Sequence, residues 1–209
     1  MIAQNSIEEF LERLASGDPT PGGGSAAAVM GAMGAALVSM VCNVSRGKQG
    51  YEASEPEMQA VLTEAATLRH RLTGMIADDI AAFDALMAAY KIPKATDADK
   101  ARRADAIQAS LRRATEVPLE CARICSAVIA LSRSAAEHGY RGVVSDAGVA
   151  VLAAHAALRS AALNVYINAP ALKDRLFAER STAEIDALVT SGALENEAIY
   201  ALVRSKLAG

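Results

Sequence analysis

The chain has 209 residues, enough for one sizeable domain with its own core, and hydrophobic residues make up 52% of it. A net charge of −3 and the absence of tryptophan argue against nucleic-acid binding. Three cysteines, an odd and sparse set, indicate a reducing compartment, so we expect a cytoplasmic protein. With no linker or repeat along the chain, residues 1–209 should form a single domain.

The first expected element is a short helix. Ser6 and Glu9 have the spacing of a capping box, and Ile7, Phe10 and Leu14 then recur on one apolar face.

A second helix is expected over residues 25–45, which carry no charge before Arg46. The segment is long enough to cross a membrane, but polar residues such as Asn43 interrupt it, and acidic residues precede it where basic ones would be needed. We interpret it as a helix buried all round in a soluble protein that does not enter a membrane. Small residues recur at every fourth position and would let a neighbouring helix approach closely: Ala27, Gly31, Ala35 and Ser39.

Three further helical segments follow. A long helix should run from about Pro56 to Tyr90, and the next should begin near Thr96 and end at Gly139. Pro118 should kink or restart that second one, because proline lacks the N–H that a helix interior needs.

The C-terminal part is also expected to be helical. Ser145 should cap a helix that continues to Asn168, and Ser181 with Glu184 has capping-box spacing, so short helices should complete the chain. No stretch alternates like a strand. The predicted fold class is all-α, a multihelical bundle around a buried central helix at residues 25–45.

A glycine-rich segment stands before that central helix. Its sequence is Pro19-Thr20-Pro21-Gly22-Gly23-Gly24-Ser25, in which the prolines stiffen the chain and the glycines permit a sharp turn and close approach to a ligand. Free N–H groups and the helix dipole there would bind oxygen atoms. The alternative is an ordinary loop and cap. A dinucleotide site would need a preceding strand, and a phosphate-binding loop would need a following lysine, so we reject both.

Asp79 is the candidate catalytic group. It shares one side of the expected helix with Ile76 and Phe83, whereas the adjacent Asp78 points about 100° away. Partial burial would raise the pKa of the Asp79 carboxyl toward the range of a general base. The alternative is a solvated acid on the outside of the helix.

Other polar groups are second-rank candidates. Asp146 lies at an expected helix N-terminus. There it could be a plain helix cap or a ligand contact. Asn164 and Asn168 lie one turn apart in an apolar helix, where they either bond the backbone or line a polar cavity. The histidines are scattered, and Cys121 and Cys125 lack a second ligand pair, so we expect no metal site.

These elements resemble the cyclodeaminase/cyclohydrolase family of folate enzymes over nearly the whole chain. The sequence differs from the family pattern at Tyr140, where many relatives have asparagine. The role of the loop over residues 139–144 is therefore left open. The matching segments are residues 19–25 and 31–37, Met40-Val41, Gly47-Lys48, Asp79-x-x-Ala82-Phe83, Pro93-Lys94, Pro118, Ser145-Asp146 and Asn164-Val165-x-Ile167-Asn168.

The resemblance implies a homodimer with a tetrahydrofolate derivative as substrate and no cofactor. Asp79 matches the proposed acid/base of the family, and the N–H groups around Gly22 to Ser25 would bind oxygen atoms of the pterin or formyl group. Asp146 and the two asparagines would meet the pterin edge, and Lys48 would meet glutamate carboxylates.

Three activities remain open from the sequence. The first is hydrolysis of methenyltetrahydrofolate to 10-formyltetrahydrofolate. The second is cyclodeaminase chemistry on formiminotetrahydrofolate, which closes the same ring and expels ammonia. The third is a non-catalytic helical module that binds folate or a protein partner, which would have no use for Asp79 in a cavity.

Overall fold

Helix follows helix along the chain, as the hydrophobic periodicity predicts. The computed structural model describes residues 5–208, and within them there is no strand. The helices are α1 (Ile7–Leu14), α2 (Gly23–Ser45), α3 (Glu55–Lys91), α4 (Asp97–His138), α5 (Val144–Asn168) and α6 (Arg175–Ala208). Short 3₁₀ turns occupy Glu52–Ser54, Arg141–Val143 and Ala169–Ala171. The all-α prediction is confirmed.

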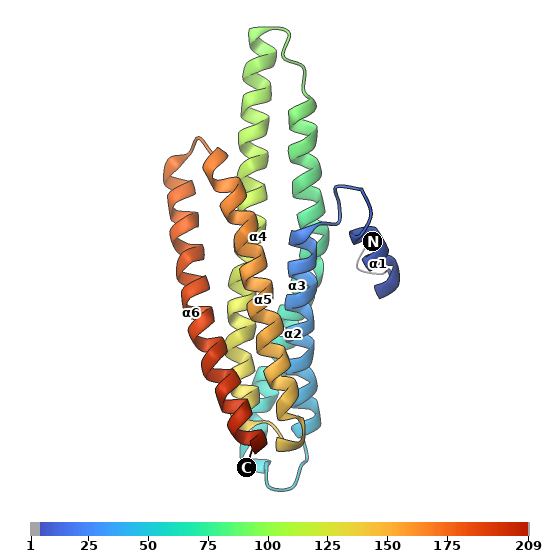
Figure 1. Cartoon of the computed structure of the whole chain (residues 1–209), viewed down its shortest axis with the longest axis vertical. Coiled ribbons are helices and arrows are strands. Elements are labelled where there is room, and N and C mark those ends of the chain that lie inside the picture. Colours follow the sequence, from blue (N-terminus) through green and yellow to red (C-terminus); the bar gives the residue numbers. More distant parts are fainter. Residues whose placement is uncertain (1–4, 209) are drawn as a thin grey trace.

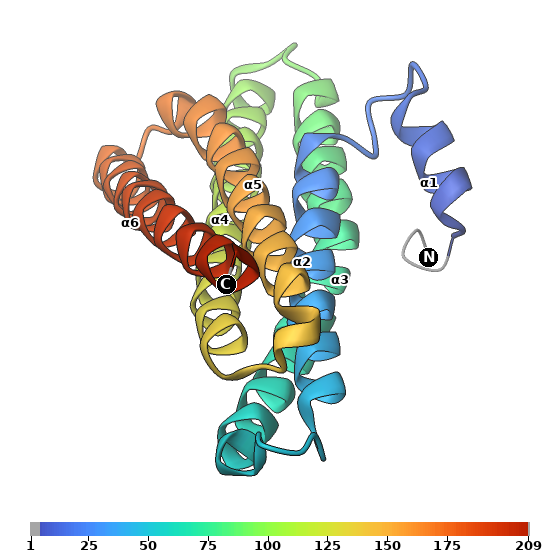
Figure 2. The same ribbon diagram turned by 60° about the horizontal axis from the view of Figure 1, so that its bottom comes forward.

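Helices α2 to α6 pack lengthwise into an elongated bundle (Figure 1). The central helix α2 packs against α3 and α5, and more lightly against α4, while α6 covers α4 and α5. Their apolar sides meet in one main core, whose fully buried side chains include Val38, Leu72, Val128, Leu158 and Ile185. Figure 2 shows α1 standing apart from the other five helices, and none of its residues is buried.

The small residues of α2 allow close packing, as predicted. A methyl group on Gly31 would lie 2.8 Å from Cys125 Sγ on α4, and one on Gly34 would lie 3.0 Å from the carbonyl oxygen of Ala150 on α5. Larger side chains at these positions would force the helices apart. Gly31 of the predicted stripe therefore sets the spacing to α4, and Gly34, outside the stripe, sets the spacing to α5.

The prediction that α2 is buried on all sides was wrong, because α3, α4 and α5 surround only part of it. Met33, at its midpoint, is 56% exposed. The open sides of α2 and α5 adjoin and make a surface that we call the α2/α5 face: Met30, Met33, Leu37 and Met40 of α2, with Val149, Ala153, Ala156, Leu163 and Ile167 of α5. No residue of α2 is charged.

Two segments are long and apolar enough to cross a membrane by composition. They are Gly23–Ser45, with a mean hydropathy of 1.8, and Arg141–Ala171, with 1.3, and half of each apolar window is buried in the bundle. The buried half is accounted for by packing against other helices.

Helix boundaries differ from prediction at three places. Helix α4 runs without a break through Pro118, which is buried inside it. Helix α5 begins at Val144, so Ser145 lies in its first turn and is not the cap. Ser181, 2% exposed, lies inside the single long helix α6, where continuous packing against α4 and α5 overrides a local capping pattern. The actual cap of α6 is Asp174, whose carboxylate accepts the Phe177 N–H at 3.0 Å.

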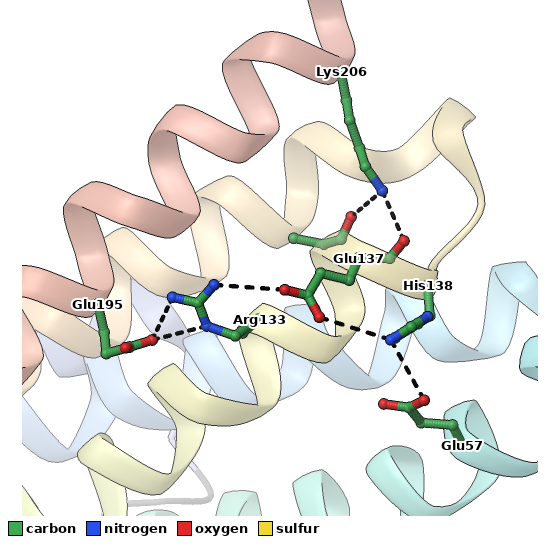
Figure 3. Close-up of polar contacts among 7 residues, drawn as sticks. Glu57, Arg133, Glu137, His138, Glu195 and Lys206 are labelled. Carbon is green, nitrogen blue, oxygen red and sulfur yellow. Dashed lines mark hydrogen bonds and ion pairs between the residues drawn. The ribbon is translucent and has the colours of Figure 1, made fainter.

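The C-terminal end of α4 is held by a polar network between helices (Figure 3). Lys206 on α6 donates to the carbonyl oxygens of Ala136 and Glu137, each at 2.7 Å, where a cation complements the helix dipole. Arg133 pairs with Glu195 of α6 at 2.6 Å, and His138 lies 3.5 Å from Glu57 of α3. The network fixes α3 and α6 to α4 at the end of the bundle that includes residues 139–144.

Gly139 closes α4 as predicted. Its N–H donates to the carbonyl oxygen of Ala135 at 3.0 Å. A methyl group on Gly139 would overlap with that same oxygen and with Val41 of α2. The chain therefore leaves α4 in close contact with α2, which sets the position of the loop that follows.

Candidate active site

Asp79 lies on α3 directly against the first turn of α2. The hydroxyl of Ser25 donates to Asp79 Oδ2 at 2.8 Å, and Ser25 itself is fully buried. The neighbouring Gly24 faces the same carboxylate so closely that a methyl group there would overlap with Asp79 Oδ1. Only glycine at position 24 leaves room for the carboxylate to reach the helix N-terminus.

Burial raises the pKa of the Asp79 carboxyl above its usual value, because a charged carboxylate loses hydration there. Hydrogen bonds from the Ser25 hydroxyl and the Ser25 backbone N–H oppose that rise, since they stabilise the ionised form. The apolar side chains of Met75, Cys121 and Ala161 line a small space that Asp79 also borders. The predicted direction of the pKa shift is confirmed.

Asp78 points away from the interior, as helical geometry predicts for the residue next to Asp79. Its side chain is 53% exposed and lies 3.7 Å from the Arg113 guanidinium on the outside of the bundle. Two adjacent acids on one helix are therefore in different environments. Only Asp79 faces the interior.

The glycine segment does not form the sharp turn that we expected. Helix α2 already begins at Gly23, and none of Gly22, Gly23 and Gly24 has a positive φ. A methyl group on Gly23 would meet nothing within 4 Å. The close approach that the glycines permit is that of the protein's own Asp79 carboxylate, and it depends on Gly24. The binding of substrate oxygens by these residues stays a prediction.

Asp79 is one of the residues that line a cavity of about 390 Å³. Its walls come from α3, α4 and the end of α5, and they are mostly apolar and aromatic. The lining residues are Asp79, Ala82, Phe83, Leu86, Met87 and Tyr90, then Leu111, Ala114, Val117 and Pro118, then Asn164, Ile167, Asn168 and Ala171. Ile167, one of the lining residues, is 76% exposed and also belongs to the α2/α5 face.

Both predicted asparagines line this cavity, and both also bond the backbone. Asn164 donates to the carbonyl oxygen of Ser160 at 3.0 Å, within its own helix. Asn168 donates to the carbonyl oxygen of Ala114 at 2.8 Å, across to α4. The two alternatives left open by the sequence are therefore both realised.

The bond from Asn168 explains how α4 continues through Pro118. Proline has no N–H, so the carbonyl oxygen four residues earlier, that of Ala114, loses its partner within the helix. The Asn168 amide supplies the missing donor. Our sequence reasoning missed the pairing, although a proline in a buried helix predicts an unpaired carbonyl four residues before it.

Two predicted site residues, Lys48 and Asp146, lie at the other end of the bundle. Lys48 follows the C-terminus of α2, about 33 Å from Gly23 along the helix. Asp146 lies in the first turn of α5, whereas Asn164 and Asn168 lie in its last turns. One chain therefore does not bring Lys48 or Asp146 to the Asp79 cavity.

The arrangement suits proton transfer to and from a cationic, mostly apolar ligand. A partly desolvated carboxylate attracts positive charge, and the raised pKa makes it a better proton acceptor. The apolar walls would hold a flat ring system beside it. Within residues 5–208, no three histidine, cysteine or acidic side chains gather as a possible metal site.

Comparisons with known proteins show which family the sequence resembles. A sequence profile described as formiminotransferase-cyclodeaminase matches residues 6–187. Methenyltetrahydrofolate cyclohydrolase of Methylorubrum extorquens is 56% identical over 207 residues, which are 99% of this chain and 100% of that protein. Formimidoyltransferase-cyclodeaminase of Mus musculus is 32% identical over 90% of this chain but only 35% of its own length.

A solved structure has the same fold. Formiminotetrahydrofolate cyclodeaminase from Thermotoga maritima superposes with a TM-score of 0.84 at 30% identity, over 100% of this chain and 98% of that one.

Proposed function

The chain belongs to the formiminotransferase-cyclodeaminase family, and on that premise we propose that it hydrolyses 5,10-methenyltetrahydrofolate to 10-formyltetrahydrofolate. It is a hydrolase that acts on a cyclic amidine in one-carbon metabolism. The observation that carries the assignment is the half-buried Asp79 carboxylate, which lines an apolar cavity and is held by Ser25. The full-length identity of 56% to a cyclohydrolase points to the same reaction.

The chemistry needs one well-placed proton acceptor. The substrate carries an amidinium-like cation, and its bridging carbon is already electrophilic. As water adds to this carbon, the Asp79 carboxylate accepts one of its protons. The bond from carbon to the ring nitrogen N5 then breaks as Asp79 returns a proton to that nitrogen. Loss of the remaining hydroxyl proton leaves a formyl group on N10, and one proton is released overall.

Ser25 and Gly24 prepare Asp79 for both steps. The Ser25 hydroxyl and N–H hold the carboxylate in one orientation and favour its ionised form against the effect of burial. Gly24 allows the contact. The asparagines at the cavity wall offer amide groups for the pterin edge, with Asn168 fixed in place by its bond to Ala114.

Cyclodeaminase activity is the second candidate, favoured by the likeness to the Thermotoga maritima structure. Both reactions act on the same carbon, so a direct comparison is the test. We expect purified protein to consume methenyltetrahydrofolate, followed by its absorbance, much faster than it releases ammonia from formiminotetrahydrofolate. Faster ammonia release would assign it as a cyclodeaminase. Folate binding without turnover of either substrate would identify a non-catalytic module.

The proposal requires no metal or cofactor, since a carboxylate suffices to deprotonate water on an activated carbon. We expect full activity after prolonged incubation with a strong chelator and its removal. A loss of activity that added zinc restores would contradict this part of the proposal.

The proposal also includes a cytoplasmic homodimer that binds neither membrane nor nucleic acid. The α2/α5 face, apolar and uncharged along α2, suits a protein interface. All three cysteines are free and buried, consistent with a reducing compartment. Light scattering at micromolar concentration should give the mass of a dimer. A monomer mass would contradict the homodimer.

A further inference from the structure

The Asp79 cavity follows one side of α3. Its lining residues on this helix recur at intervals of three and four, from Asp79 to Tyr90. The rise of an α-helix puts about 16 Å between these two residues along the axis. Tyr90 lies one residue before the end of α3, so the cavity extends from the candidate catalytic carboxylate to the C-terminal turn of the helix. The proposed reaction makes no use of that second end.

The proposed substrate is long enough to reach the second end. Its bridging carbon would lie at Asp79, and an aminobenzoyl ring and then a glutamate residue follow through N10. Ordinary bond lengths put the side-chain carboxyl of this glutamate about 13 Å from the bridging carbon in the extended form. Along α3 that distance ends within one turn of Tyr90. The other direction along α3 is closed, because α2 packs there with Gly31 against Leu72.

Arg103 of α4 lies at the Tyr90 end of the cavity. Its guanidinium stands over the Tyr90 ring, 5.8 Å from the ring centre. Its Nε and Nη2 donate to the Tyr90 carbonyl oxygen at 3.4 and 3.3 Å. The Arg103 side chain is half-buried by such contacts. Tyr90 therefore positions a cation at the end of the cavity opposite Asp79.

The Arg103 guanidinium has no carboxylate partner within residues 5–208. Asp99, one turn earlier on α4, pairs with Arg102 at 3.1 Å instead. Within the same described part of the chain, Nη1 of Arg103 makes no hydrogen bond. A planar guanidinium with free N–H groups can bind a carboxylate through two parallel hydrogen bonds. The arginine is therefore available to an acidic ligand.

The surroundings of Tyr90 suit the charged end of a ligand. The end of α3 and the start of α4 project beyond the connection between α5 and α6 (Figure 1). Tyr90 is 43% exposed there. A carboxylate bound at this position keeps part of its hydration, so its binding avoids the large desolvation cost of a buried ion pair.

We propose that Arg103 binds the glutamate carboxylates of the substrate at the Tyr90 end of the Asp79 cavity, with Tyr90 as its positioning residue. The protein then distinguishes a pterin ligand that carries a glutamate from one that lacks it. Lys48, from which we expected this cation, lies at the other end of the bundle. The inference rests on the proposed function for the identity of the ligand, and its test separates the two.

Binding of two ligands that differ only in the glutamate tests this subsite without turnover. Tetrahydrofolate carries the glutamate and tetrahydropteroate lacks it, and calorimetric titration of purified protein gives a Kd for each. The wild type should prefer tetrahydrofolate. Arg103→Gln should lower the ratio of the two affinities about three- to tenfold, because a charge-assisted pair to the carboxylate is lost. The ratio cancels any damage to the part of the cavity that both ligands share.

Arg102→Gln is the matched control. This neighbouring arginine is 64% exposed and pairs with Asp99, so the affinity ratio should stay within about twofold of the wild-type ratio. Arg103→Lys keeps the charge but not the planar fork, and should retain an intermediate ratio. Tyr90→Leu removes the ring beneath the guanidinium and should also lower the ratio, as a positioning residue requires.

Ionic strength gives a readout that a purely structural role would not move. Salt screens an exposed ion pair. Added sodium chloride should therefore weaken tetrahydrofolate binding to the wild type more than to Arg103→Gln, and should weaken tetrahydropteroate binding less in both proteins. An equal salt response of tetrahydrofolate binding in the two proteins contradicts the pair.

The outcomes separate the subsite from the proposed function. A glutamate preference that Arg103→Gln lowers, in a protein that turns over no folate, supports the subsite while the proposed function fails. Turnover of methenyltetrahydrofolate together with equal affinities for the two ligands overturns the subsite alone. So does an unchanged ratio in Arg103→Gln, or an equal loss in Arg102→Gln. A protein that binds neither ligand overturns both.

Discussion

The charged groups at the two ends of the bundle lie in opposite environments. At one end the Asp79 carboxylate is partly buried beside apolar walls, without a cationic partner among the residues that line its cavity. At the other end Arg133, His138 and Lys206 lie near acidic groups or helix carbonyls, at the surface (Figure 3). The second arrangement supports the fold, whereas the first raises the energy of the ionised state and keeps it reactive.

The contrast teaches where catalytic capacity resides in this molecule. A surface ion pair contributes at most about 1 kcal/mol, so its loss should hardly be felt in turnover. A desolvated carboxylate that contacts substrate should matter by orders of magnitude in turnover while it destabilises the fold. Four substitutions test this difference, from the largest expected effect to the smallest.

Replacing Asp79 should have the largest effect. Asp79→Asn keeps the shape but cannot accept a proton, so kcat should fall ~10²–10⁴-fold with the fold intact. Asp78→Asn is the control on the adjacent, exposed residue and should leave kcat near the wild-type value. Steady-state rates on methenyltetrahydrofolate measure both. More than about a tenth of wild-type activity in Asp79→Asn would remove Asp79 from its catalytic role.

The same variant should be more stable than the wild type at neutral pH. Because burial raises the pKa of Asp79 in the folded protein, the folded state binds more protons than the unfolded state between the ordinary and the raised pKa. Stability therefore falls as pH rises through that window. Thermal midpoints should favour Asp79→Asn at pH 7, and the difference should shrink as pH falls toward the ordinary aspartate pKa.

Gly24→Ala should be the next most damaging change. Its methyl group overlaps with Asp79 Oδ1, so either the carboxylate or the start of α2 must move. We expect at least about a tenfold loss of activity and ~1–3 kcal/mol of lost stability from overpacking. Gly23→Ala is the matched control, because a methyl group there meets nothing within 4 Å. Equal effects of the two variants would show that the glycines act only through backbone freedom.

Ser25→Ala should shift the pH dependence more than the maximal rate. The Ser25 hydroxyl lowers the pKa of Asp79, so its removal raises that pKa further. The acidic limb of the kcat/KM profile should therefore move to higher pH, with the plateau at high pH less affected. Ser39→Ala is the control, since the Ser39 hydroxyl bonds the Ala35 carbonyl in its own helix. An unmoved acidic limb in Ser25→Ala would show that this hydroxyl does not tune Asp79.

Arg133→Gln at the opposite end should have the smallest effect. The pair with Glu195 is 34% and 47% exposed, so its loss should cost less than about 1 kcal/mol of unfolding free energy. Activity should be unchanged. Denaturant unfolding and a rate measurement on the same preparation check both statements, and a large loss of activity would mean that the two ends are coupled.

The sequence predicted the environment of some residues and not of others. Helical spacing showed that at most one of Asp78 and Asp79 could face inward and made Asp79 the candidate, but a solvated position outside the helix stayed open for it. The contact of Asp79 with Gly24 and Ser25 was not predicted, because those residues lie on another helix and periodicity within a helix contains no information on which helices adjoin. The capping pattern at Ser181 failed for a related reason, since packing along the whole of α6 outweighs a local signal.

The sequence by itself determined the helical class, most helix ends, the side of α3 on which the acid lies, and, through resemblance, the family. These depend on interactions over a few residues, which neighbouring side chains specify. Only the tertiary structure decided that Asp79 meets the start of α2, that Asn168 satisfies the carbonyl freed by Pro118, and that Lys48 lies at the opposite end from Asp79. Each of these joins distant segments, and their pairing depends on how all the apolar faces are buried at once.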